Sequence, residues 1–213
     1  MQKIFLILLC FKVSHVFAQP RIPVKAIDSI FQRMHVSDDD WAISLSVEQA
    51  GTIYDSLGNS VNENPLGTFL FLKVDKTCFL QRLSYDYSGD TMEPKLIIGN
   101  RLKTTDVSNL NYTIDSIQLA ETEWIYPYIY KNDSLNTYGI QIPADHEPYY
   151  GMYFKVTRKE GFTIYFTETD LAEAETFHHF KNLNYGYNSR TFINRVFLAV
   201  TALIKGNFKS LDK

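Results

Sequence analysis

An alternating row of aromatic residues is the feature of the sequence with the clearest chemical potential. Trp124, Tyr126, Tyr128 and Tyr130 stand at every second position, so a strand over residues 124–131 would place all four side chains on one face. Flat rings suit the C–H faces of sugars, and a tyrosine adds a polar hydroxyl at its tip. We therefore predict these four residues as a ligand-binding surface. The alternative is a strand covered on both faces, whose rings belong to the core or to a half-buried surface.

The carboxylates suggest a second possible chemistry, the hydrolysis of glycans. A glycosidase needs two carboxyl groups opposed across a sugar, one of them with a raised pKa. The candidates in the second half of the chain are Glu121, Glu123, Asp145, Glu147, Glu168, Asp170, Glu173 and Glu175. Their spacing along the sequence identifies no opposed pair, so the catalytic residues of such an enzyme stay unknown.

Metal and nucleophile chemistry has little support in the sequence. Glu175 and His179 could share a helix face, but they form no known ligand motif. We expect no metal site and no cofactor. Cys78 lies in a strand-like run with no clear histidine partner nearby, which predicts a buried, inert thiol. The chain lacks Gly-x-Ser-x-Gly and glycine-rich phosphate loops, and these absences favour a protein that is not an enzyme.

Short alternating runs separated by turn residues predict the elements that position these groups. The runs are residues 41–47, 52–54, 67–74, 78–87, 95–98, 112–119, 124–131, 138–142, 149–157 and 162–167. No long helical segment separates them, so parallel strands joined by helices are not expected. The sequence predicts an α+β fold with one large, mostly antiparallel sheet of about nine or ten strands, arranged as a meander or barrel.

Helical periodicity predicts a short N-terminal helix and one or two C-terminal helices packed on the sheet. The predicted ranges are residues 24–35, 170–181 and 189–205. Thr167 and Asp170 have the spacing of a capping box at the start of the second helix. Asn188 or Ser189 can cap the third. The apolar run of that last helix, residues 196–204, is about half the length of a membrane span, which favours burial against the sheet.

The first 18 residues have the pattern of an export signal. Lys3 precedes an apolar run over residues 4–11, and Val16-Phe17-Ala18 matches a signal-peptidase site. Cleavage after Ala18 leaves residues 19–213 as a single globular α+β domain whose one cysteine can form no internal disulfide. We therefore predict a bacterial protein that is exported to the periplasm or secreted.

Composition and charge narrow the partners that we expect. The chain has 213 residues, of which 45% are hydrophobic and 15% aromatic, and its formal net charge is -3. These values exclude a disordered chain and argue against nucleic acid as a partner. We expect a small molecule, a glycan or a protein partner, and no membrane span after signal cleavage.

Three hypotheses follow for the function. The first is an exported, non-catalytic binding or envelope-associated protein. The second is an extracytoplasmic hydrolase that acts on glycans through a carboxylate pair. The third is a purely structural or assembly protein that uses a sheet edge or the tyrosine-rich segment 182–188 as its interface.

Overall fold

A computed structural model describes most of the predicted domain. The described residues are 22–34, 37–49, 67–74, 77–86, 95–104, 112–141, 147–174 and 180–211. The predicted signal peptide and the predicted strand at residues 52–54 lie outside these ranges. So do Asp145, Glu175 and all five histidines, including His179.

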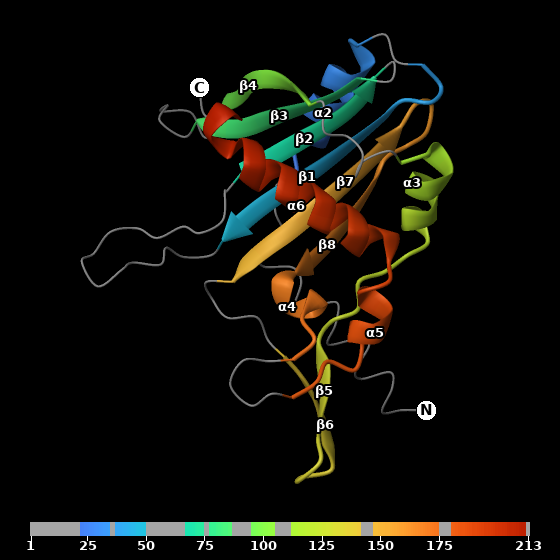
Figure 1. The fold of residues 1–213 in the computed structure, drawn as a ribbon, viewed down its shortest axis with the longest axis vertical. Coiled ribbons are helices and arrows are strands. Elements are labelled where there is room, and N and C mark those ends of the chain that lie inside the picture. Colours follow the sequence, from blue (N-terminus) through green and yellow to red (C-terminus); the bar gives the residue numbers. More distant parts are fainter. Residues whose placement is uncertain are drawn as a thin grey trace, which may run out of the picture.

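Six strands form one antiparallel sheet in the order β4-β3-β2-β1-β7-β8 (Figure 1). They are β1 (Trp41–Gln49), β2 (Gly67–Val74), β3 (Thr77–Asp86), β4 (Lys95–Thr104), β7 (Pro148–Val156) and β8 (Phe162–Thr167). A separate hairpin of β5 (Ile129–Asn132) and β6 (Thr137–Ile140) projects from one end of the molecule. The predicted α+β fold with a large antiparallel sheet is confirmed. The sheet is open, with β4 and β8 at its edges, so the barrel alternative is wrong.

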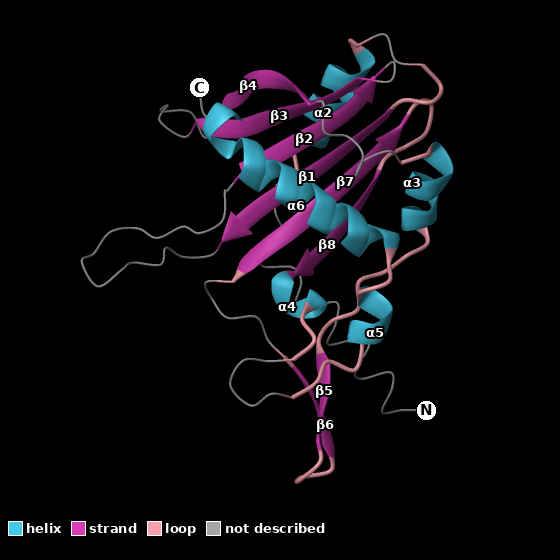
Figure 2. Ribbon diagram, in the orientation of Figure 1, coloured by secondary structure: helices cyan, strands magenta, loops and turns pink. Residues whose placement is uncertain are grey.

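Helices cover both faces of the sheet (Figure 2). The long helix α6 (Phe192–Leu211) crosses one face, and the short helix α2 (Val24–Gln32) packs on the other. Alternation along β1 explains the two cores: Ile43 belongs to the α6 side and Ala42 to the α2 side. Most of the apolar run 196–204 therefore belongs to the core, as predicted, although Leu198 in the same run is 58% exposed. Within the part of the chain that the structure describes, no helix is long and apolar enough to cross a membrane.

Two predicted strands are corrected by the structure. Residues 112–119 were expected as a strand, but α3 (Ile114–Glu121) occupies this region. Its cap is Thr113, whose hydroxyl accepts a hydrogen bond from the backbone N–H of Ser116 at 3.2 Å. The predicted strand over residues 124–131 is also wrong for most of its length, because β5 begins only at Ile129.

The predicted C-terminal helices are corrected as well. The capping box of Thr167 and Asp170 is present, but the helix that it starts, α4 (Glu168–Leu171), ends after one turn. A second short helix, α5 (Tyr185–Asn188), forms inside the predicted loop. The long helix begins later than expected: the Thr191 hydroxyl accepts from the Asn194 N–H at 3.1 Å, which makes Thr191 the cap instead of Asn188 or Ser189.

Candidate functional site

The site is built where the segment after α3 meets α4, α5 and the start of α6. Asn188, fully buried, connects these elements. Its Oδ1 accepts from the backbone N–H of Tyr126 at 3.0 Å, and its Nδ2 donates to the Tyr126 carbonyl at 2.8 Å. The same Nδ2 donates to the Asp170 carbonyl at 2.8 Å. One amide side chain thus replaces the missing partner strand of residue 126, which is why this segment is ordered without being part of a sheet.

Asp170 is the second centre of this polar network. Its Oδ1 accepts from the Tyr128 N–H at 3.2 Å, and its Oδ2 accepts from the Thr167 N–H at 2.8 Å and the Thr167 hydroxyl at 3.0 Å. Asn182 donates to the Asp170 carbonyl at 3.2 Å and the Ala172 carbonyl at 3.0 Å. Asp170 is only 7% exposed, and both of its carboxylate oxygens accept hydrogen bonds from the fold, so it serves the architecture.

The four predicted ligand-binding residues do not share one face. Tyr128 is fully buried, and its hydroxyl donates to the Phe180 carbonyl. Tyr130 stacks on the Phe180 ring, with ring centres 4.8 Å apart and an interplanar angle of 5°. Trp124 and Tyr126 are 69% and 45% exposed. The row separates because the backbone of Tyr126 and the N–H of Tyr128 bond to the side chains of Asn188 and Asp170 instead of a neighbouring strand, so strand alternation does not apply.

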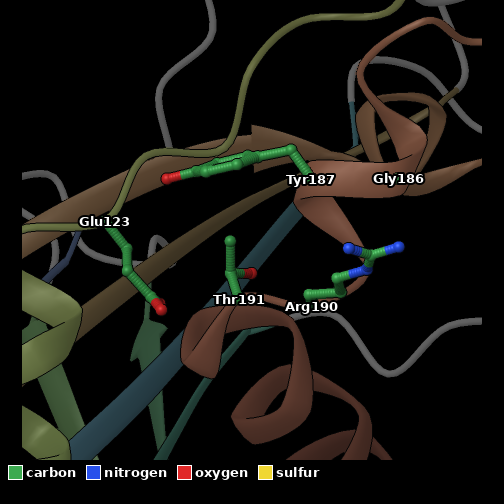
Figure 3. A pocket seen from close by; sticks show the side chains of 5 residues that line it. All are labelled: Glu123, Gly186, Tyr187, Arg190 and Thr191. Carbon is green, nitrogen blue, oxygen red and sulfur yellow. The ribbon is translucent and has the colours of Figure 1, made fainter.

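Tyr126 contacts a residue that lines an open hollow of about 380 Å³, and Trp124 follows another lining residue, Glu123, in the chain. The residues that line the hollow are Glu123, Gly186, Tyr187, Arg190 and Thr191. Figure 3 shows the Tyr187 ring lying across Thr191, with Glu123 on one side and Arg190 on the other. The Tyr126 ring packs against the Tyr187 ring, with ring centres 5.0 Å apart and an interplanar angle of 62°. We call Trp124, Tyr126 and these five lining residues the junction site.

The polar groups of the junction site differ in whether they already form hydrogen bonds or ion pairs with the rest of the protein. Glu123 accepts from the backbone N–H of Ile193 at 3.1 Å through Oε2, so its carboxylate caps the first turn of α6. The Thr191 hydroxyl donates to the Asn188 carbonyl at 2.8 Å and accepts from Asn194. Within the described residues, by contrast, the Arg190 guanidinium has no ion-pair or hydrogen-bond partner.

Cys78, Glu147 and Glu168, which the sequence analysis considered, have ordinary structural surroundings. Cys78 is buried, and burial raises the pKa of its thiol, with Lys73 opposing the shift. The Tyr150 hydroxyl donates to Glu168 at 3.5 Å, and burial followed by the charge of Glu168 raises the pKa of Tyr150. Glu147 accepts from the Thr169 N–H. Among the described residues, no three His, Cys, Asp or Glu side chains group as a metal site.

A second, larger hollow of about 550 Å³ lies between α3 and α6. Its lining residues are Tyr112, Ser116, Phe192, Arg195, Leu198, Ala199 and Ala202. Arg195 lies over the Phe192 ring, with its guanidinium carbon 5.7 Å from the ring centre. In the part of the chain that the structure describes, Glu123 is the only acidic residue that lines either of these two hollows.

Sequence reasoning identified the tyrosine-rich segment 182–188 but missed the roles of Asn188 and Arg190. A buried asparagine bonded to a residue 62 positions away leaves no local signal. A single arginine between two helices is equally ordinary in a sequence. Compared with known proteins, the chain matches no family model, no curated protein and no solved structure.

Proposed function

We propose that this protein is an exported, non-catalytic binding protein that recognises a glycan at the junction site. The observation that carries the proposal is a pair of exposed, contacting rings, Tyr126 and Tyr187, at a hollow with polar groups, next to a third exposed ring, Trp124, which follows the lining residue Glu123 in the chain. Trp124 is 69% exposed, and Tyr126 and Tyr187 are each 45% exposed. Large rings are seldom left in water at such exposures in one place unless they contact something, and an aromatic surface with a polar border suits a sugar.

The residues that line the hollow also favour binding over the hydrolase alternative. A glycosidase holds a pair of carboxyl groups across the sugar, whereas among the described residues Glu123 is the only acidic one that lines this hollow. The Glu123 carboxylate also accepts a hydrogen bond from α6. One oxygen of this carboxylate is therefore already engaged in capping the helix.

The proposal is tested by measuring the binding of a panel of oligosaccharides by isothermal titration calorimetry. Trp124→Ala and Tyr187→Ala should each weaken binding about three- to tenfold, the amount that one aromatic contact contributes. The matched control is Tyr138→Ala, because Tyr138 is 69% exposed like Trp124 but lies on β6 of the hairpin.

A blocking variant gives an independent test. A Cβ added at Gly186 meets no atom within 4 Å, so Gly186→Trp fills open space without disturbing the core. This variant should fold normally and lose binding. The proposal is wrong if no oligosaccharide binds, or if Tyr138→Ala weakens binding as much as Trp124→Ala does. Release of new reducing ends from a bound glycan would favour the hydrolase alternative instead.

An assembly role is the second candidate, and the projecting hairpin favours it. Leu135, Tyr138 and Ile140 are 70%, 69% and 42% exposed, and an isolated two-stranded hairpin gains stability when another surface covers it. If Tyr138→Ala changes the oligomeric state or solubility while glycans do not bind, this candidate replaces the first.

Export is tested separately from binding. The protein expressed with its own first residues in a bacterium should be recovered from the periplasm or the medium, beginning at Gln19. Recovery from the cytoplasm with residues 1–18 intact would contradict the export part of the proposal.

A further inference from the structure

The charge distribution of the junction site points to a particular class of glycan. Arg190 lines the hollow, and within the described residues no carboxylate pairs with its guanidinium. An arginine side chain presents several N–H donors in a rigid planar fork, which matches the two oxygens of a carboxylate. Among the residues that the structure describes, an exposed anion-binding group thus stands without a partner at the wall of the hollow.

Glu123 does not cancel this positive charge, although it lies in the same hollow. Its Oε2 atom accepts the Ile193 N–H at 3.1 Å, in the first turn of a 20-residue helix. The positive end of the helix dipole compensates the carboxylate locally. Figure 3 shows Glu123 and Arg190 on opposite sides of Thr191, with the guanidinium directed away from the carboxylate.

The ring of Tyr187 sets how a sugar would lie relative to Arg190. Figure 3 shows this ring spanning the hollow between the two charged side chains. The Thr191 hydroxyl is already used in capping α6, so Thr191 offers the hollow mainly its methyl group. A pyranose stacked on the Tyr187 ring would therefore meet apolar surface along its face and a cationic donor at one edge.

We infer that the ligand is an acidic glycan, and that the carboxylate of a uronic acid residue pairs with Arg190 while the sugar ring stacks on Tyr187. This inference rests on the proposed function, because it names the class of glycan that the junction site binds. The formal charge of the whole chain is -3, so long-range attraction cannot supply the selectivity. The contact with Arg190 has to supply it at short range.

The test compares uronic acid oligomers with their methyl esters, which keep the ring and lose the charge. Oligomers of galacturonate, glucuronate and mannuronate are titrated against the full-length protein by calorimetry, each beside its ester and the neutral parent sugar. The charged form should bind at least about tenfold more tightly than its ester, as expected for a charge-assisted contact. Sulfated oligomers of equal charge should bind less tightly than uronates, because the planar guanidinium of Arg190 matches the two oxygens of a carboxylate.

Variants assign the selectivity to Arg190. Arg190→Gln should reduce the affinity for the uronate to that for its ester, while Arg190→Lys should keep part of the preference. The matched control is Arg195→Gln, because Arg195 lies five residues further along and lines the other hollow. Circular dichroism checks that each variant is folded, and Arg190→Lys provides the second measurement if Arg190→Gln does not fold.

The outcomes separate this inference from the proposed function. Equal binding of uronates and esters, or a preference that survives in Arg190→Gln, overturns the inference and leaves glycan binding intact. Tighter binding of the sulfated oligomers overturns the choice of a carboxylate. If no charged or neutral oligosaccharide binds, the proposed function fails and the inference fails with it.

Discussion

Replacing Asn188 by alanine is the most informative single perturbation of this fold. Asn188 is fully buried and makes two hydrogen bonds to the backbone of Tyr126 and one to the carbonyl of Asp170. Alanine removes all three bonds. The Asp170 carbonyl keeps a hydrogen bond from Asn182 at 3.2 Å. The backbone N–H and carbonyl of Tyr126, in contrast, have no other partner among the described residues.

The expected loss of stability follows from these three bonds. Each contributes roughly 0.5–1.5 kcal/mol net, and a buried N–H left without a partner costs more. We expect Asn188→Ala to lower the free energy of unfolding by about 3 kcal/mol, which for a chain of this size lowers Tm by roughly 6–12 °C. Affinity at the junction site should fall as well, because Asn188 positions the backbone that carries the Tyr126 ring.

Urea unfolding measures this loss and includes a graded control. Trp41 is fully buried and reports on the core, and far-ultraviolet circular dichroism provides an independent probe. The control is Asn184→Ala, because the Asn184 side chain donates a single hydrogen bond, to the Pro127 carbonyl at 2.7 Å, and should cost about 1 kcal/mol. If Asn188→Ala costs no more than Asn184→Ala, the polar network does not hold the junction together and the reasoning fails.

Three further predictions concern the rest of the fold. The Cys78 thiol, buried and with a raised pKa, should resist Ellman's reagent at pH 8 until the protein is unfolded, and rapid native labelling would contradict its burial. The pKa of Tyr150 is raised in the folded state, so the unfolded state ionises first and the free energy of unfolding should fall as the pH rises above about 10. Tyr150→Phe should make the urea midpoint fall less steeply over this pH range, and an unchanged slope would reject the assignment to Tyr150. A Cβ at Gly139 would collide with the Tyr130 ring, so Gly139→Ala should cost about 1 kcal/mol in thermal unfolding, whereas Gly186→Ala should be neutral; equal effects would refute the contact.

Much of the sheet could be predicted because its strands carry their own local signals. The predicted strands at residues 67–74 and 162–167 have the same bounds in the structure, since each is a short run rich in aromatic, aliphatic and β-branched residues. The capping box of Thr167 and Asp170 could also be predicted from the sequence, because a capping box is a contact between residues three positions apart. Residues 112–119 misled the prediction because Thr113 caps a helix there, and Ile117 and Ala120 pack into the core three residues apart.

The junction site was beyond sequence reasoning for a different reason: long-range contacts decide where its rings lie. Alternation predicted one shared face for the aromatic residues of 124–130, and this was wrong because the backbone of Tyr126 and Tyr128 is bonded to Asn188 and Asp170, which stand 62 and 42 positions away. Those bonds divide the row, so that Tyr128 anchors the fold and Trp124 is left on the surface. Asn188 therefore links the stability of the fold to the geometry of the junction site, whereas Trp124 contributes only to the proposed binding surface. Asn188→Ala should reduce both quantities, whereas Trp124→Ala should reduce binding and leave the unfolding free energy nearly unchanged, because an exposed ring contributes little to the core.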